Sequence, residues 1–160
     1  MITYKYVRLE EGQNDAYIDV EKFWSKIHEQ AIKEDFETGW MIWKVVPVEG
    51  DENAANQPDF LIMNFYQDSV QMNKGVDFYK LGRSVYSKLS KKKFDKIWEA
   101  GPYGTRNFYQ LERLDNTTWL FGDLEIGTTL TLNAFKQTDE NYEQYEMDFY
   151  KKWHNKRILN

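Results

Sequence analysis

The chain has 160 residues, 41% of them hydrophobic, which suits one folded domain or one domain with an extension. The formal net charge is −5 and the longest basic run is Lys91-Lys92-Lys93, so we expect no nucleic-acid partner. Cysteine is absent, which excludes disulfides, thiolate metal sites and thiol catalysis. No apolar run reaches about 18 residues, so we expect no membrane partner. The compartment stays open: the protein is either cytoplasmic or exported after loss of a leader that this chain does not contain.

Residues 2–9 predict a strand in which Tyr4 and Tyr6 share one face. Residues 20–32 then predict an amphipathic helix, because apolar residues recur at the i, i+3, i+4 and i+7 spacing of one buried face. Asp19 is the expected N-cap of this helix. The apolar positions of the helix are Val20, Phe23, Trp24, Ile27, Ala31 and Ile32.

Further elements follow before residue 115. Residues 40–46 and 60–66 predict two strands that pair antiparallel through a polar loop. Residues 84–98 predict one helix with an apolar face, and residues 105–114 predict another strand. The order β-α-β-β-α-β is that of the ferredoxin-like motif, an antiparallel sheet with helices on one face. We therefore expect an α+β fold of this type, followed by an extra C-terminal β-α unit.

The C-terminal segment aligns with the N-terminal segment at a constant offset of 126 residues, which places His154 opposite His28. The strand candidate 128–135 aligns with 2–9 without a gap. We therefore predict a partial internal repeat with a second helix at 147–158; the alternative is two unrelated amphipathic helices. The predicted organisation is a ferredoxin-like domain at 1–114, a connector at 115–127 and a partial second repeat at 128–160.

A resemblance to a known family rests on three stretches. They are Phe23-Trp24-Ser25-Lys26-Ile27-His28, the pair Gly39-Trp40 and the strand from Asp59 to Tyr66. Over about residues 2–114 the chain resembles the dimeric α/β-barrel superfamily, whose ferredoxin-like sheets pair face to face. The resemblance implies a homodimer, in which the aromatic sheet face is buried against a second sheet. Because the superfamily includes cofactor-free monooxygenases, haem-handling enzymes and proteins of no known activity, the fold does not select a function.

Tandem members of this superfamily carry two ferredoxin-like halves in one chain. The second copy predicted here stops after its first helix, at Asn160. We expect the chain to be a truncated form of a longer tandem protein. The alternative is a β-α appendage that packs on the first half or swaps into a neighbouring chain.

His28 is the main candidate for a catalytic residue. A histidine at the mouth between a helix and a sheet can act as a general base or as a ligand for haem or a metal. Haem is therefore a candidate cofactor, although the sequence requires none, and one histidine per half is too few for a metal site without carboxylates. The alternative is a histidine on the helix flank that bonds a backbone carbonyl or water.

A group of polar and aromatic residues predicts a small-molecule pocket on the sheet. Polar groups among aromatic side chains are typical of such pockets, and the ligand expected is apolar or aromatic. The alternative is a half-buried strand whose polar atoms bond to the backbone. The candidate ligand-binding residues are Tyr6, Trp40, Trp43, Asn64, Tyr66 and His154.

Three functions are compatible with these observations. The first is a domain that binds a small molecule on its sheet, and the second is a cofactor-free or haem-dependent monooxygenase. The third is a structural or oligomerisation module. A cavity on the order of several hundred Å³ lined by Trp43, Asn64 and Tyr66 favours the first two functions, and His28 facing that cavity favours the second.

Overall fold

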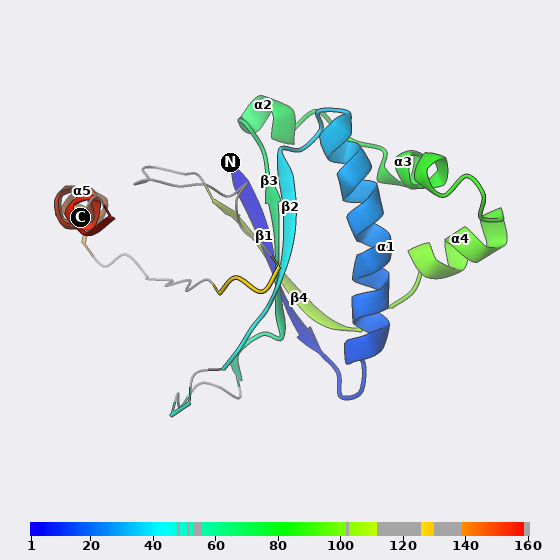
Figure 1. Cartoon of the computed structure of the whole chain (residues 1–160), viewed down its shortest axis with the longest axis horizontal. Coiled ribbons are helices and arrows are strands. Elements are labelled where there is room, and N and C mark those ends of the chain that lie inside the picture. The colour runs from blue at the N-terminus through cyan, green and yellow to red at the C-terminus, as the bar shows by residue number, and fades with distance from the viewer. Residues whose placement is uncertain are drawn as a thin grey trace. The chain divides into compact units, whose positions relative to one another are not determined.

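The computed structural model describes residues 1–47, 49–50, 52, 56–101, 103–111, 126–129 and 139–158, except the side chains of residues 150, 151 and 153–158. The chain divides into two compact units, Met1–Glu112 and Arg113–Asn160. The described residues form an α+β fold with a four-stranded antiparallel sheet and five helices (Figure 1). None of these helices is long and apolar enough to cross a membrane.

The sheet lies in the first unit, and its strand order is β2-β3-β1-β4. β1 (Ile2–Leu9) pairs antiparallel with β3 (Phe60–Phe65) and with β4 (Gly104–Leu111). β2 (Gly39–Lys44) pairs antiparallel with β3, as predicted from the sequence. It follows that β1 and β2 run parallel to each other on either side of β3. The last residues of the final predicted strand, 112–114, lie outside the described part of the chain.

The register aligns the strand residues in rows, and successive rows point to opposite faces of the sheet. One face is covered by helices, and the other carries most of the tyrosine rings of the sheet. The rows on the helix-covered face are Trp40–Asn64–Thr3–Gln110, Ile42–Ile62–Lys5–Phe108 and Lys44–Phe60–Val7–Arg106. The rows on the opposite face are Gly39–Phe65–Ile2–Leu111, Met41–Met63–Tyr4–Tyr109 and Trp43–Leu61–Tyr6–Asn107.

The long helix α1 (Asn14–Lys33) begins earlier than the predicted start at Val20. The prediction of Asp19 as its N-cap is therefore wrong: Asp19 lies inside the helix, where its carboxylate accepts a hydrogen bond from Lys22 Nζ at 2.9 Å. Tyr17 supplies the physical reason, because its side chain is fully buried against the sheet. Burial of a side chain of this size contributes about 1.5–3 kcal/mol. This gain is larger than the free-energy cost of placing the neighbouring polar residues in a helix.

The prediction of one continuous helix at 84–98 is also wrong. The structure has two helices in this region, α3 (Phe78–Val85) and α4 (Lys91–Trp98). Asp77 caps α3 and Ser90 caps α4, each by accepting a hydrogen bond from the backbone N–H three residues further on. Because each helix has its own cap, the chain changes direction between them and both helices can pack on α1.

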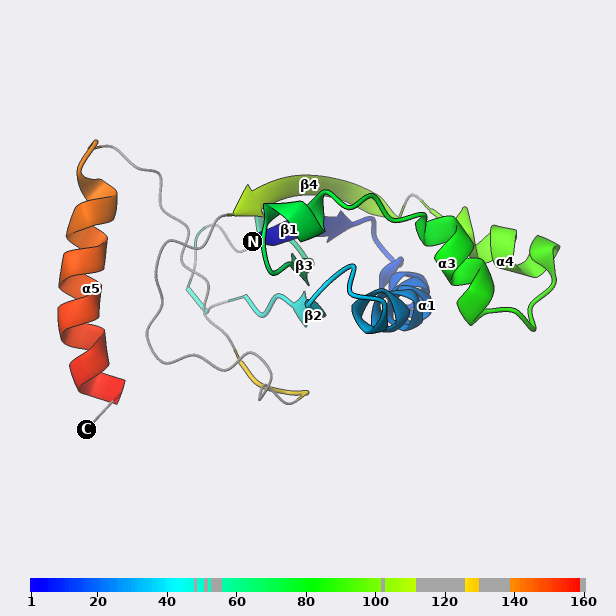
Figure 2. The same ribbon diagram turned by 90° about the horizontal axis from the view of Figure 1, so that it is seen from above.

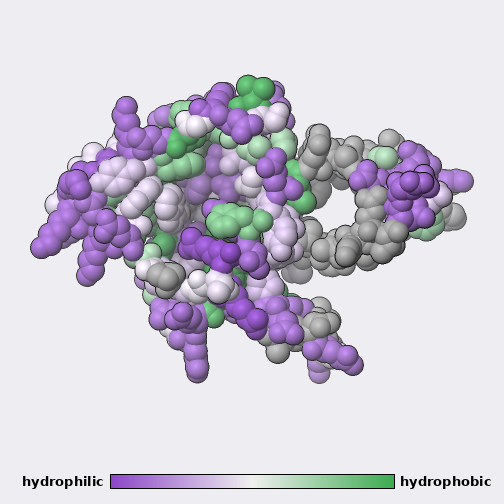
Figure 3. All heavy atoms as spheres, turned by 180° about the vertical axis from the view of Figure 1, so that it is seen from behind, coloured by the Kyte–Doolittle hydropathy of each residue, from purple (hydrophilic) through white to green (hydrophobic). Residues whose placement is uncertain are grey.

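α3 and α4 lie on the side of α1 that faces away from the sheet (Figures 1 and 2). A Cβ atom at Gly82 would lie 2.9 Å from Ile27 Cδ1 and 2.9 Å from Phe94 Cζ, so only glycine permits this close approach of α3 to α1. The side chains that project from the outer end of α3 and α4 are mostly hydrophilic (Figure 3). The buried cluster between the helices contains Phe23, Ile27, Ala31, Leu81 and Phe94.

The placement of α3 and α4 beyond α1 has a consequence for the sheet. α1 packs over the middle of the helix-covered face, where Tyr17 meets Val7, Phe60 and Ile62. β4, at the edge of the sheet, keeps its side chains exposed along nearly its whole length, and Phe108 is 67% exposed. The helix-covered face is therefore open above β1 and β4.

The opposite face of the sheet carries a third buried cluster. Tyr4, Leu61 and Met63 are buried there. The ring of Tyr4 stacks on that of Tyr109 with centroids 5.0 Å apart, and Tyr6 meets both rings edge-on. Aromatic residues on this face therefore pack mainly on one another across neighbouring strands.

The second unit contains α5 (Tyr142–Ile158), which includes the predicted helix at 147–158 and begins earlier. Tyr142 Oη donates a hydrogen bond to Glu146 one turn further on, at 2.7 Å. The predicted strand at 128–135 lies outside the described residues, apart from its first two positions. The internal repeat therefore stays a prediction.

Candidate functional site

A cleft of about 540 Å³ lies between α1 and the open part of the helix-covered face. β1, β3 and β4 form its floor, and Trp24 and His28 of α1 stand beside it together with Phe78 at the start of α3. Ligand pockets in proteins usually measure about 300–1,000 Å³. The cleft is thus large enough for a small organic molecule.

Three buried polar side chains meet at the inner end of the cleft. Glu37, which is 2% exposed, follows the end of α1 and precedes β2. Its Oε2 lies 2.8 Å from His28 Nδ1, and its Oε1 accepts a hydrogen bond from Asn64 Nδ2 at 2.9 Å. Both carboxylate oxygens are therefore bonded, which is how a buried carboxylate is stabilised in a protein interior.

The bond to Glu37 orients the imidazole of His28. A carboxylate at Nδ1 favours the tautomer that carries its proton on Nδ1 and leaves Nε2 as the acceptor. No described residue makes a hydrogen bond to Nε2, and His28 lines the cleft. An imidazole held in this way can take a proton from a bound molecule or bind an iron through Nε2.

Aromatic rings hold His28 on several sides. Its ring stacks on Trp40 with centroids 5.2 Å apart and an interplanar angle of 11°. Phe78 lies 5.4 Å away and Trp24 6.0 Å away, both tilted. These rings restrict the imidazole to one orientation and give the inner end of the cleft an apolar surface.

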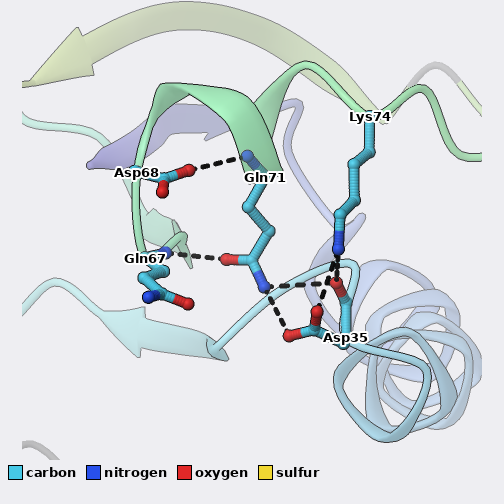
Figure 4. A network of polar contacts seen from close by, with 5 residues as sticks. All are labelled: Asp35, Gln67, Asp68, Gln71 and Lys74. Carbon is cyan, nitrogen blue, oxygen red and sulfur yellow. Dashed lines mark hydrogen bonds and ion pairs between the residues drawn. The ribbon is translucent and has the colours of Figure 1, made fainter.

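A polar network anchors the turn that carries Glu37 (Figure 4). Asp35 adopts a left-handed conformation with φ of 59°, and its carboxylate accepts from Gln71 Nε2 at 3.0 Å and from Lys74 Nζ at 2.9 Å. Gln71 lies in the short helix α2 (Ser69–Met72) and is 5% exposed. The end of α1 is thus tied to α2, and Glu37 projects from a turn that is held in place.

Tyr66 lies at the same end of the cleft, just after β3. Burial raises the pKa of its phenol, and the negative charge of Glu37 raises that pKa further. Tyr66 is therefore protonated near neutral pH and can donate a hydrogen bond to a ligand.

Two cationic side chains lie further along the floor. Lys5 of β1 is half-buried, and its Nζ lies 5.5 Å from the ring centroid of Phe108 on the neighbouring strand. Arg106 of β4 follows one row further, with its Cζ 6.0 Å from the ring of Tyr17. Glu21 of α1, buried at 7% exposure, is the carboxylate that acts most strongly on Lys5. This end of the cleft therefore carries two positive charges and one negative charge.

The structure brings four of the predicted site residues together. His28, Trp40, Asn64 and Tyr66 all line the cleft. His154 lies in α5, but its side chain is outside the described residues.

Tyr6 and Trp43 are not part of this group, because they lie on the opposite face of the sheet and both align with Leu61. Trp40 and Trp43 are three positions apart on one strand, so their side chains point to opposite faces. The predicted pocket that combines Trp43 with Asn64 is therefore not observed as one site.

Sequence reasoning missed Glu37, Lys5 and Arg106. Glu37 belongs to no motif, since it reaches His28 only because the chain turns at the end of α1. The position of Lys5 could have been predicted from the sequence. Lys5 lies between Tyr4 and Tyr6 on one strand, and the alternation of side chains places it on the same face as Val7. Nothing in the sequence places Arg106 beside Lys5, because that depends on the register of β4.

No protein-family model matches the chain, and no curated protein and no solved structure is significantly similar to it. Within the described part of the chain, no cluster of three or more His, Cys, Asp or Glu side chains is arranged to hold a metal ion. The functional argument therefore rests on the cleft and its residues.

Proposed function

We propose that the first unit binds a small aromatic molecule in the cleft between α1 and the sheet. The observation that carries this proposal is a cavity of about 540 Å³ whose aromatic surface surrounds convergent polar groups. Trp24, Trp40 and Phe78 offer apolar surface to a planar ligand. His28 Nε2 and the phenol of Tyr66 offer hydrogen bonds that would orient it.

A second candidate function is that of a cofactor-free or haem-dependent monooxygenase. The contact between Glu37 and His28 Nδ1 favours it, because it leaves Nε2 as the basic nitrogen of a residue that lines the cleft. The same arrangement suits a histidine that binds haem iron, since such a ligand usually bonds an acceptor through its other nitrogen. His28 is the only residue of the cleft that we assign to haem.

We also propose that this unit is a ferredoxin-like domain of the dimeric α/β-barrel superfamily. The strand order β2-β3-β1-β4, with β1 and β2 parallel on either side of β3, supports this assignment. We include in this proposal a homodimer formed through the opposite face of the sheet, as the resemblance to this superfamily implies. Light scattering after size-exclusion chromatography tests the assembly: a dimer is expected, and a monomer at high protein concentration would contradict it.

Ligand binding is tested by titrating the full chain with a panel of aromatic compounds and with haemin. We expect saturable quenching of tryptophan fluorescence, because Trp24 and Trp40 line the cleft. Trp40→Phe should reduce the quenching, whereas the matched variant Trp43→Phe, on the other face of the same strand, should leave it unchanged. Absence of saturable binding by every compound, haemin included, would overturn the proposed function.

The same titration separates the candidate chemistries. A haem absorption band that is lost in His28→Gln would support the haem-dependent enzyme, since the amide can still bond Glu37 but binds iron poorly. Consumption of oxygen by the unloaded protein with a bound aromatic compound would support the cofactor-free enzyme. Binding without either reaction would leave a binding domain.

A further inference from the structure

We propose that the aromatic ligand carries a negatively charged group, such as a carboxylate, which binds between Lys5 and Arg106. This inference rests on the proposed function and names the chemical class of the ligand. It assigns a role to the cationic end of the cleft, while the ligand's ring system lies toward His28.

The main observation is a half-buried lysine, Lys5, without an ion pair. Lysine is rarely removed from water unless a carboxylate accompanies it, because the charged form is costly to desolvate. In the described part of the chain, neither Lys5 nor Arg106 forms an ion pair. The lysines that do form ion pairs with carboxylates there are Lys22, Lys26, Lys33, Lys74 and Lys91.

Two carboxylates act on Lys5 without pairing with it. Burial lowers the pKa of Lys5 and Arg106 lowers it further, whereas Glu21 and, more weakly, Glu37 act in the opposite direction. Both carboxylate oxygens of Glu37 are already bonded to other side chains. Glu21 and Glu37 offset part of the charge of the two cations. Neither carboxylate forms an ion pair with Lys5 or Arg106 in the described part of the chain, so both cations can still bond an anionic group of a ligand.

The rows of the sheet set the size of this ligand. Lys5 lies one row from the row of Asn64, and Arg106 lies one row further in the same direction. Two residues along a strand span about 7 Å, which is the length of a one- or two-ring aromatic system. A carboxylate at Lys5 therefore places the ring beside His28, and the exposed ring of Phe108 can cover its outer side.

The test compares two probes of nearly equal shape, 2-naphthoate and its neutral amide, 2-naphthamide. Binding to the full chain is measured by calorimetry at low and at high salt. We expect naphthoate to bind at least about tenfold more tightly, with a preference that decreases as salt screens the charges. Lys5→Gln and Arg106→Gln should each reduce the preference.

The matched control is Lys44→Gln. Lys44 lies on the same face and in the same row as Arg106, but at the far edge of the sheet. Lys44→Gln removes the same charge as Lys5→Gln but far from the proposed anion site, so it should leave the preference for naphthoate unchanged. Circular dichroism verifies that all variants are folded.

The outcomes separate this inference from the proposed function. Equal binding of the two probes would overturn the anionic ligand while the aromatic pocket stands. Loss of preference in the control as well as in Lys5→Gln would also overturn it, because the effect would then come from overall charge. If neither probe binds, the anion site is refuted, and the wider panel of aromatic compounds and haemin decides whether the pocket stands.

Discussion

Replacing Glu37 by leucine should destabilise the first unit more than the same replacement at an exposed glutamate of α1. The substitution removes the acceptor of two buried contacts, from His28 at 2.8 Å and from Asn64 at 2.9 Å. Leucine fills a similar space but leaves both partners without a hydrogen bond in an interior position, where Asn64 is 4% and His28 7% exposed.

The magnitude follows from the number of donors that lose their partner. Removing one member of a buried charged or hydrogen-bonded group usually costs about 3–5 kcal/mol, since the groups left behind remain desolvated. Glu37→Gln should cost only about 1–2 kcal/mol. Its amide oxygen can still accept from His28, and Asn64 can turn its own amide to accept from the new one.

The assay is urea unfolding of the full chain, followed by far-UV circular dichroism and tryptophan fluorescence. The matched control is Glu29→Leu on the outer side of α1, where the side chain is 49% exposed and pairs with Lys26 and Lys33. This exposed change should cost much less, because exposed ion pairs contribute little to stability. The reasoning fails if Glu37→Leu and Glu29→Leu lower the free energy of unfolding equally.

Two further variants test the packing and the turn. Gly82→Ala should cost about 1–3 kcal/mol in the same unfolding assay, because its Cβ would meet Ile27 at 2.9 Å; a neutral effect would show that α3 can shift. A hydrogen bond from Lys74 and the charge of Lys74 hold the pKa of Asp35 below its usual range. The ion pair therefore stabilises the protein at pH values above the ordinary aspartate pKa of about 4, and this stabilisation is lost as the pH falls and Asp35 is protonated. Asp35→Asn should therefore be less stable than the parent at neutral pH, and the difference should shrink in acid; a difference independent of pH would contradict this.

Local patterns in the sequence were sufficient for much of the architecture. The apolar stripe of α1 predicted a helix with one buried face, and Phe23, Ile27 and Ala31 are buried as expected. Alternation along the strands predicted which residues of a single strand share a face, as for Tyr4 and Tyr6. The same local reasoning failed at the ends of elements, because the start of α1 depends on the burial of Tyr17 against strands far away in the sequence.

The break between α3 and α4 lay within reach of the sequence. Asp77 and Ser90 are residues that favour N-caps, and both act as caps in the structure. The apolar residues over 84–98 fit one continuous helix, so the pattern gave no sign that a second helix begins after Ser90.

The sequence by itself determined that His28 lies on a helix flank among aromatic residues and that Lys5 and Tyr6 point to opposite faces. Only the tertiary structure decided that His28 meets Glu37 and Asn64, and that Lys5 has Arg106 one row away on the adjacent strand. The physical reason is that periodicity acts within one element, whereas register and turn geometry depend on how distant elements pack. The candidate site is built from contacts between elements, so no pattern along the chain could assemble it.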